Sequence, residues 1–409
     1  MRTKYLLMAV TALLVASCSQ NEVTEVRTDD NPNIGFDVYT GVATKGTDVS
    51  TGTMQKTVDD LGGFGVMGYY TGSKTWEEAD KTKITPSFMF NQLVTYESNK
   101  WTYSPTKYWP NNKADKVSFF AYAPYEFAET AKKRVGITTS GSTETGVPFL
   151  DFTLKEGASL DKMVDLVVAK VYDRSADEST ITFNFEHILS KIGFQVKLGD
   201  EYAGLDGTNS FVYITHMWIV GKTSTNSVSV LENKLINESS KFYKKATWKD
   251  LRWNYDEANI AQEDYDLSNL LNKDENGITE RWEDGTEKKI TGIKLTKDNK
   301  TDKVNLFPAN QYLYLIPMNE TAENTKVGCK ANEVKIGFHY DIVTKTTDST
   351  DSAPVYLVSH FENAVSLPNT HMQRGQFYTY TFVINLKEIT ISDAKVGNWD
   401  STPGDTELH

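Results

Sequence analysis

The chain has 409 residues, and its 55 Asp and Glu outnumber its 43 Lys and Arg, which gives a formal net charge of −12. This charge repels nucleic acid and anionic lipid, so neither is expected as a partner. The length exceeds what one hydrophobic core usually supports and predicts two domains. Aromatic residues make up 12% of the chain, which favours β-structure because their flat rings fit a half-buried pleated surface.

Residues 1–18 have the pattern of a signal peptide. Arg2 and Lys4 precede an apolar run over residues 5–15, which is too short for a transmembrane helix. The cysteine that follows, Cys18, comes after an aliphatic and two small residues, and this arrangement resembles the lipobox of bacterial lipoproteins. The resemblance implies that Cys18 is acylated and tethers the mature chain to a membrane. The alternative is an ordinary secretory signal with an incidental cysteine.

The residues after Cys18 predict a flexible tether. Residues 19–33 are polar and hold almost nothing that could be buried. Cys329 is the second of the chain's 2 cysteines, so lipid on Cys18 would leave it without a disulfide partner. Stability is therefore expected to come from packing.

Short apolar or alternating runs bounded by Gly, Pro, Asn and Asp predict strands. They occupy residues 34–40, 64–70, 88–96, 101–109, 117–123, 165–170, 181–187, 192–198, 211–220, 241–248, 304–318, 333–342, 355–361, 377–386 and 389–399. The sequence lacks long amphipathic helical periods. The expected fold class is all-β, with β-sandwich domains over residues 34–225 and 226–409. We expect a polar, turn-rich insertion in the second domain at about residues 250–300.

The apolar pattern changes parity between two neighbouring runs. Phe183 and Phe185 share one face of the first run, whereas Ile192 and Phe194 have the opposite parity. A bulge or sharp bend is therefore expected at residues 188–191. At this bend, His187 is interpreted as a buried, hydrogen-bonded histidine rather than a ligand.

Two motifs with the spacing of ligand-binding sites are interpreted as structural elements instead. Residues 63–68 fit G-x-G-x-x-G but are followed by β-forming tyrosines, so they predict a strand with close-packed glycines. Residues 272–283 have calcium-loop spacing, but the first ligand position is Asn and no helices flank it, which favours a solvated hairpin. The six histidines are scattered, and no catalytic motif is present. We expect no enzyme activity, no cofactor and no metal site.

A set of motifs in a fixed order resembles the fimbrillin family, the type V pilins and their minor-subunit relatives. These motifs are FGVMGYY at residues 64–70, FMFNQ at 88–92, WTYSP at 101–105, VSFFAYAP at 117–124, DLVVA at 165–169, FEHILSK at 185–191, YLIP at 314–317 and YTYTF at 378–382. The resemblance covers nearly the whole mature chain. It implies two transthyretin-like β-sandwiches in tandem and a lipoprotein of the outer membrane and cell surface.

The resemblance also implies a mechanism of assembly. In this family a protease cuts after a basic residue, usually Arg, and removes the first strand. A C-terminal strand of another subunit then fills the groove by donor-strand exchange. Carried over to this sequence, the cut falls at Lys45-Gly46, and Lys45 departs from the usual Arg.

The strands in this exchange are also implied by the resemblance. The removable strand carries Ile34, Phe36 and Val38, and the donor strand over residues 389–399 carries Ile389, Ile391, Val396 and Trp399. Partners would be other fimbrillin subunits, the outer membrane through lipid on Cys18, and a host or bacterial surface ligand. The stalk, tip or anchor position stays open.

The alternative function is a surface-tethered binding lipoprotein that does not polymerise. It would have the same sandwiches and would bind glycans or proteins. Its binding side chains would be exposed aromatics that stack on glycans, with Trp76, Trp248, Trp253 and Trp282 as candidates.

Overall fold

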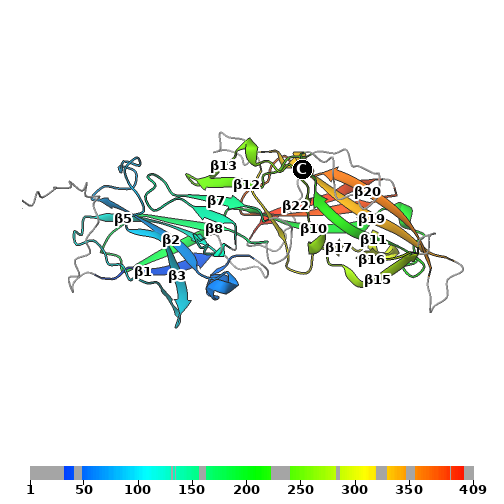
Figure 1. Cartoon of the computed structure of the whole chain (residues 1–409), viewed down its shortest axis with the longest axis horizontal. Helices are drawn as coiled ribbons and strands as arrows, with labels where there is room; N and C mark the ends of the chain where they lie inside the picture. The colour runs from blue at the N-terminus through cyan, green and yellow to red at the C-terminus, as the bar shows by residue number, and fades with distance from the viewer. Residues whose placement is uncertain are drawn as a thin grey trace, which may run out of the picture.

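The computed structural model describes residues 32–40, 48–129, 132–133, 135–155, 163–222, 240–281, 286–318, 329–346, 355–386 and 388–399. In these residues the chain is elongated and built of strands, with β1 to β5 at one end and β15 to β20 at the other (Figure 1). The all-β prediction is confirmed. Cys18, Lys45 and Gly46 lie outside the described residues.

Helices in this part of the chain are short. The α-helix α1 (Thr51–Met54) has 4 residues. The 3-10 helices are η1 (Val58–Asp60), η4 (Asp200–Tyr202), η5 (Glu257–Asn259), η6 (Ser268–Leu270), η7 (Lys297–Lys300) and η8 (Ala331–Glu333). Over the described ranges, no helix has the length and apolar character needed to cross a membrane.

The first sheet has 7 strands in the order β1-β9-β8-β5-β2-β3-β4. In β9, Ile181, Phe183 and Phe185 are buried and the residues between them are exposed, as the alternating sequence predicts. Phe64 and Phe119 pack on the same face in one aromatic core. The strands are β1 (Gly35–Thr40), β2 (Phe64–Gly72), β3 (Met89–Glu97), β4 (Lys100–Thr102), β5 (Lys116–Ala123), β8 (Val167–Arg174) and β9 (Thr180–His187).

A 4-stranded sheet in the order β13-β12-β7-β6 covers the other face of the first sheet. Met67 and Tyr122 of the first sheet belong to the same hydrophobic core as Leu150 of β7 and Trp248 of β12. The strands of this 4-stranded sheet are β6 (Ile137–Thr139), β7 (Phe149–Thr153), β12 (Lys245–Lys249) and β13 (Arg252–Asn254). Because β7 pairs with β12, this sheet joins strands from the two halves of the chain.

Two more sheets form the C-terminal end. Phe338 of β19 and Phe382 of β21 meet with ring centroids 4.7 Å apart, so the sheets face each other across a shared core. One sheet contains β10 (Ser190–Leu198), β17 (Val304–Asn305), β18 (Leu313–Leu315), β21 (Gln376–Ile384) and β22 (Ile389–Asn398). The other contains β11 (Ser210–Ile219), β14 (Tyr265–Asp266), β15 (Asp274–Arg281), β16 (Glu287–Leu295), β19 (Lys335–Lys345) and β20 (Tyr356–Ser366).

Strand pairing changes from the first sheet to the C-terminal sheets earlier than the expected domain boundary at residue 225. Both β10 and β11 precede that residue, yet β10 pairs with β21 and β11 pairs with β19. The change falls at residues 188–189, between β9 and β10. The parity change that predicted a bulge or bend at residues 188–191 thus has a larger cause, because the two runs belong to different sheets. The limits of the two domains stay a prediction.

The charged stretch expected as a polar insertion contains four strands. β16 pairs with β11 and so continues the sheet, and β15 pairs with β16. The N–H of Asn276 donates to Asp274 Oδ1 at 2.9 Å, which is an Asx turn. The hairpin interpretation of residues 272–281 agrees with this geometry, while Glu283 lies outside the described residues.

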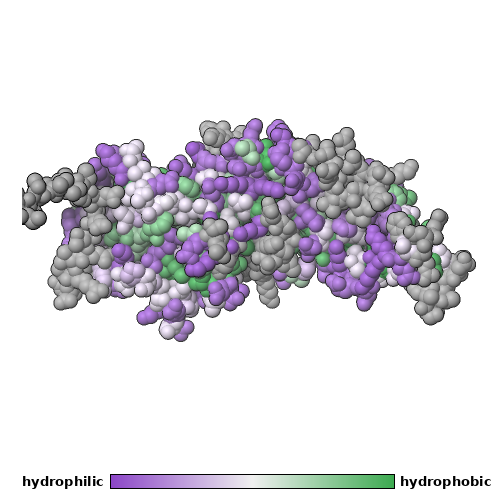
Figure 2. Space-filling model, viewed as in Figure 1, coloured by the Kyte–Doolittle hydropathy of each residue, from purple (hydrophilic) through white to green (hydrophobic). Residues whose placement is uncertain are grey.

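The surface agrees with the charge of the chain. Among the coloured residues of Figure 2, hydrophilic residues are widespread and hydrophobic residues show in smaller areas between them. Large hydrophobic side chains that are at least one third exposed include Tyr39 at 59% and Leu357 at 66%.

The G-x-G-x-x-G run forms strand β2, and its interpretation as a strand with close-packed glycines can be tested at Gly65. A Cβ atom at Gly65 would lie 2.4 Å from Tyr122 Cε1 and 2.9 Å from Asn91 Oδ1. We expect Gly65→Ala to lower the free energy of unfolding by about 1–3 kcal/mol, because the buried ring must move. Gly204→Ala is the control, since a Cβ there meets nothing within 4 Å. Urea unfolding measures both, and equal stability of the two variants would contradict the prediction.

Candidate functional site

Strand β1 lies in a groove at the edge of the first sheet. In the part of the chain that the structure describes, its one neighbour in that sheet is β9, which runs parallel to it. On the other side, the N–H of Ile34 donates to the carbonyl of Lys107 at 3.0 Å. Tyr103 Oη also donates to the carbonyl of Ile34, at 2.8 Å. The groove is therefore bounded by β9 and by residues 103–107.

Alternate residues of β1 fill this groove. Ile34, Phe36 and Val38 are 1%, 5% and 7% exposed, whereas Asp37 and Tyr39 face solvent. The Phe36 ring contacts four core rings at centroid distances of 5.2 to 6.4 Å, those of Phe64, Tyr103, Phe119 and Phe183. These three side chains thus belong to the core and are supplied by an edge strand.

Residues on both sides of the Lys45 segment are hydrogen-bonded to each other. The N–H of Thr51 donates to Thr40 Oγ1 at 2.8 Å, and the N–H of Thr40 donates to Thr51 Oγ1 at 3.2 Å. The last residue of β1 is therefore held next to the start of α1. Lys45 and Gly46, the predicted cleavage position, have no described geometry.

A buried ion pair follows this segment. Asp48 is 3% exposed, and its carboxylate lies 2.6 Å from Lys191 Nζ on β10. Tyr314 Oη on β18 donates to the same carboxylate at 2.6 Å. Lys191 is 1% exposed, so water cannot replace either charged partner. The pair ties the segment after β1 to two strands of a C-terminal sheet.

Asp165 and His187 extend this group to the end of β22. Asp165 is fully buried, accepts a hydrogen bond from the N–H of Val49 at 2.8 Å and lies 2.8 Å from His187 Nδ1. The His187 ring stacks on Trp399 at 4.4 Å, and Trp399 stacks on Tyr314 at 5.4 Å. His187 is hydrogen-bonded, as predicted, and its side chain is largely buried at 9% exposed. We name this group the junction cluster: Asp48, Asp165, His187, Lys191, Tyr314 and Trp399.

Strand β22, the implied donor strand, lies at the edge of a C-terminal sheet. It pairs antiparallel with β21 along its length and is therefore part of that sheet. A register shift between Ile391 and Asp393 changes the parity of its inward face. Ile391 and Val396 on either side of this shift therefore both pack against the core. Ile389 and Trp399, at its two ends, are 6% and 2% exposed.

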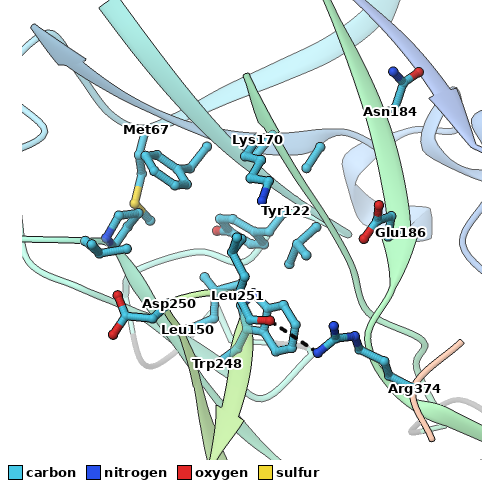
Figure 3. Close-up of a pocket in the computed structure, with 16 residues that line it drawn as sticks. Met67, Tyr122, Leu150, Lys170, Asn184, Glu186, Trp248, Asp250, Leu251 and Arg374 are labelled. Carbon is cyan, nitrogen blue, oxygen red and sulfur yellow. Dashed lines mark hydrogen bonds between the residues drawn. The ribbon is translucent and has the colours of Figure 1, made fainter. Parts of the chain in front are cut away.

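A pocket of about 340 Å³ lies between the first sheet and the 4-stranded sheet (Figure 3). Lys170 and Glu186 bring charges to it from the first sheet. Arg374 lies 5.1 Å above the Trp248 ring and donates from Nη1 to the carbonyl of Leu251 at 3.2 Å. The pocket thus combines charges of both signs with the aromatic side chains of Phe120, Tyr122 and Trp248.

The tryptophans proposed for glycan stacking belong to the core. Trp76, Trp248 and Trp253 are 8%, 7% and 0% exposed. Trp76 stacks on Tyr172 at 5.8 Å, and Trp248 packs edge-on against Trp253 at 5.5 Å. Trp282 lies outside the described residues. For the three described tryptophans, the expectation of exposed stacking platforms is therefore wrong.

Three side chains that could bind a metal meet on strands β19 and β20. The ligand atoms of His339, Asp341 and His360 lie within 4.8 Å of one another. Burial lowers the pKa of His339 to about 4, whereas the hydrogen bond to Asp341 raises the pKa of His360. This group was not predicted from the sequence, because His360 lies on a different strand from His339 and Asp341 and no short motif links them.

Sequence reasoning also missed most of the junction cluster. Asp48 and Lys191 are 143 residues apart, and no local pattern pairs positions at that distance. The one available signal was Lys191 itself, a cation at the start of an apolar run.

Because the ion pair of the junction cluster is buried, we expect a large loss of stability when Lys191 alone is made neutral. We expect Lys191→Met to lower the free energy of unfolding by about 3–5 kcal/mol, because Asp48 is left charged and buried. The double variant Asp48→Asn/Lys191→Met should recover a large part of this loss. Lys197→Met, on the same strand and half-buried, is the control. Urea unfolding of each variant measures the effect, and a double variant no more stable than Lys191→Met would contradict it.

Comparisons with known proteins agree with the motifs. The model of a family described as fimbrillin-like matches residues 56–399. The fimbrium subunit Fim1C of Phocaeicola vulgatus is 32% identical over 419 residues, with 100% of both chains covered. The crystal structure of a fimbrial protein from Bacteroides vulgatus is 29% identical, has a TM-score of 0.66, and matches 90% of this chain and 100% of that one. The resemblance found in the sequence is confirmed, and the chain belongs to the fimbrillin-like family.

Proposed function

We propose that the chain is a structural subunit of a cell-surface fimbria that assembles by proteolytic removal of β1 and donor-strand exchange. The single observation that carries this proposal is β1 itself, an edge strand whose alternate side chains belong to the core. The family and the similar fimbrium subunit support a structural role in a fimbria rather than a catalytic one. The exchange of strands is what the resemblance to the family implies, and the geometry of β1 and β22 supports it.

Removal of β1 would open a groove that strongly favours a replacement strand. Burying Ile34, Phe36 and Val38 contributes about 1.5–3 kcal/mol for each side chain. The backbone groups of β9 and of residues 103–107 would lose their partners as well, and an unpaired strand edge binds other strands. A strand with apolar side chains at alternate positions meets both requirements.

Strand β22 supports the donor role because it is an edge strand with an apolar face. It carries Ile389 and Ile391 before the register shift and Val396 after it, followed by Trp399. To serve another subunit, it must leave β21, and Trp399 must leave the junction cluster. Asp48, which follows the predicted cut, belongs to the same cluster, so processing and strand release would act on one group of side chains.

The proposal also covers how the chain is anchored to the membrane and where it stands in the fimbria. Lipid on Cys18 would hold the unprocessed chain at the outer membrane until the cut at Lys45 separates it. A chain that is not cut keeps its groove filled by β1. Such a chain would serve only at an end of the fimbria, as an anchor or terminal subunit.

The central prediction concerns the cut at Lys45. Limited cleavage by a protease that accepts Lys should convert monomers into oligomers that survive detergent, because the open groove takes β22 of another copy. Deletion of residues 389–409 should prevent oligomers, and Lys45→Gln should stay uncut and monomeric as the matched control. Electrophoresis without heating and size-exclusion chromatography measure the result. Trimmed protein that unfolds, or stays monomeric with β22 intact, would favour the binding lipoprotein instead.

A separate prediction concerns the membrane. We expect Cys18→Ala to abolish membrane retention, because the acylated cysteine is the anchor that the sequence indicates. Fractionation of cells into membrane and soluble protein measures it, with Cys329→Ala as the control that keeps the lipobox. A Cys18→Ala chain that stays in the membrane fraction would show that another feature anchors the protein.

A further inference from the structure

Strands β11, β19 and β20 place a row of ionisable side chains next to one another. In the register of these strands, His339 pairs with His216 on one side and with Glu362 on the other. Asp341, two residues further along β19 and on the same face, pairs with His360. Directly paired residues in a sheet have Cβ atoms about 4.5–5.5 Å apart. The fold therefore assembles imidazoles and carboxylates that are scattered in the sequence.

The sheet curls so that a fourth strand reaches this row. β15 lies at the opposite edge of the sheet from β20, yet Glu280 Oε1 on β15 lies 3.3 Å from His360 Nε2. These four strands and β16, which lies between β15 and β11 in the sheet, stand together at one end of the molecule (Figure 1). Beside the ionisable residues they enclose a small hydrophobic core of Phe211, Tyr213, Ile278, Ile290 and Val343.

The ligand atoms have the spacing of a metal site. Asp341 Oδ1 lies 3.3 Å from His339 Nε2 and 2.7 Å from His360 Nδ1. Ligands at about 2.0–2.1 Å from a tetrahedral zinc ion stand about 3.3 Å from one another. The His339 and Asp341 side chains are each 2% exposed, while His360 is 16% and Glu280 11% exposed. The last two therefore form the side from which an ion could enter.

His339 is oriented as a metal ligand by its other ring nitrogen. Its Nδ1 lies 2.7 Å from Thr215 Oγ1, and that hydroxyl is within 3.3 Å of the carbonyl of His339. When the hydroxyl donates to this carbonyl, Nδ1–H donates to the hydroxyl and Nε2 presents a lone pair. Nε2 is buried and has no hydrogen-bond partner among the described residues. The Asp341 carboxylate lies beside it, with Oδ1 3.3 Å from Nε2, and a cation bound to both groups would stabilise this arrangement.

We propose that His339, Asp341 and His360 bind a divalent transition metal ion, with water as the fourth ligand. Glu280 lies on the Nε2 side of the His360 ring, away from the Nδ1 that faces Asp341, so it would accept a hydrogen bond from Nε2–H and orient the ring. Two imidazoles and a carboxylate suit zinc and its neighbours rather than calcium or magnesium, which prefer all-oxygen sites. The ion would also balance carboxylates that are buried beside the imidazoles. Because Glu280 belongs to β15 and contacts His360 of β20, an ion that holds His360 in place would also keep the two edges of the curled sheet together.

The test is zinc binding by the full chain without an affinity tag. After EDTA treatment and dialysis, equilibrium dialysis with metal analysis should find about one zinc ion per chain. At zinc concentrations about 100 times the dissociation constant, the melting temperature should rise by about 5–10 °C. Cobalt in place of zinc should give the visible absorption bands of a four-coordinate site.

Matched variants assign the site. His339→Gln and His360→Gln should each lose the bound zinc and the rise in melting temperature, whereas His371→Gln, at an exposed histidine, should keep both. Circular dichroism checks folding, and if His339→Gln does not fold, the partly exposed His360→Gln decides. Wild-type protein that binds no zinc, or a folded His360→Gln variant that binds it as wild type does, overturns the proposal.

Discussion

The ion pair between Asp48 and Lys191 is the constraint on which the arrangement of the two ends of the described chain depends. Both groups are almost fully buried, and a buried charge without its partner is strongly destabilising. The segment after β1 must therefore stay beside β10 and β18. Through Asp165 and His187 the same group also positions Trp399 at the end of β22. One polar cluster thus links the first and last strands that the structure describes.

The strands of this fold could be predicted from the sequence because each carries its own pattern. In β9 the burial of alternate residues follows the apolar parity of the sequence. In β21 the apolar residues at even positions are buried as well, although Phe377 and Thr381 of the opposite parity are also buried. Ile34, Phe36 and Val38 were identified in the same way, and they lie in the core. Strand β16, in the stretch expected to be an insertion, was missed because it joins the sheet by pairing with β11, which is far from it along the chain.

The polar sites could not be predicted for a related reason. Asp48 meets Lys191, and His339 meets His360, only because sheets bring distant strands into register. A buried polar side chain needs a partner, but the sequence does not say which residue it is. His187 was interpreted correctly because its position on an apolar face already indicated burial. The tryptophans show the converse error, since composition alone cannot separate an exposed ring from a core ring.

The pairing of β7 with β12 determines how the subunit responds to force. β7 precedes and β12 follows the change of sheet between β9 and β10, and the two strands form an antiparallel ladder from Phe149↔Lys249 to Thr153↔Lys245. Both run roughly along the long axis of the molecule (Figure 1). A pull along that axis loads the hydrogen bonds of the ladder in shear, because they lie perpendicular to the strands. The bonds must then break together instead of one after another, so the two ends of the subunit are joined by a mechanical clamp rather than by a hinge.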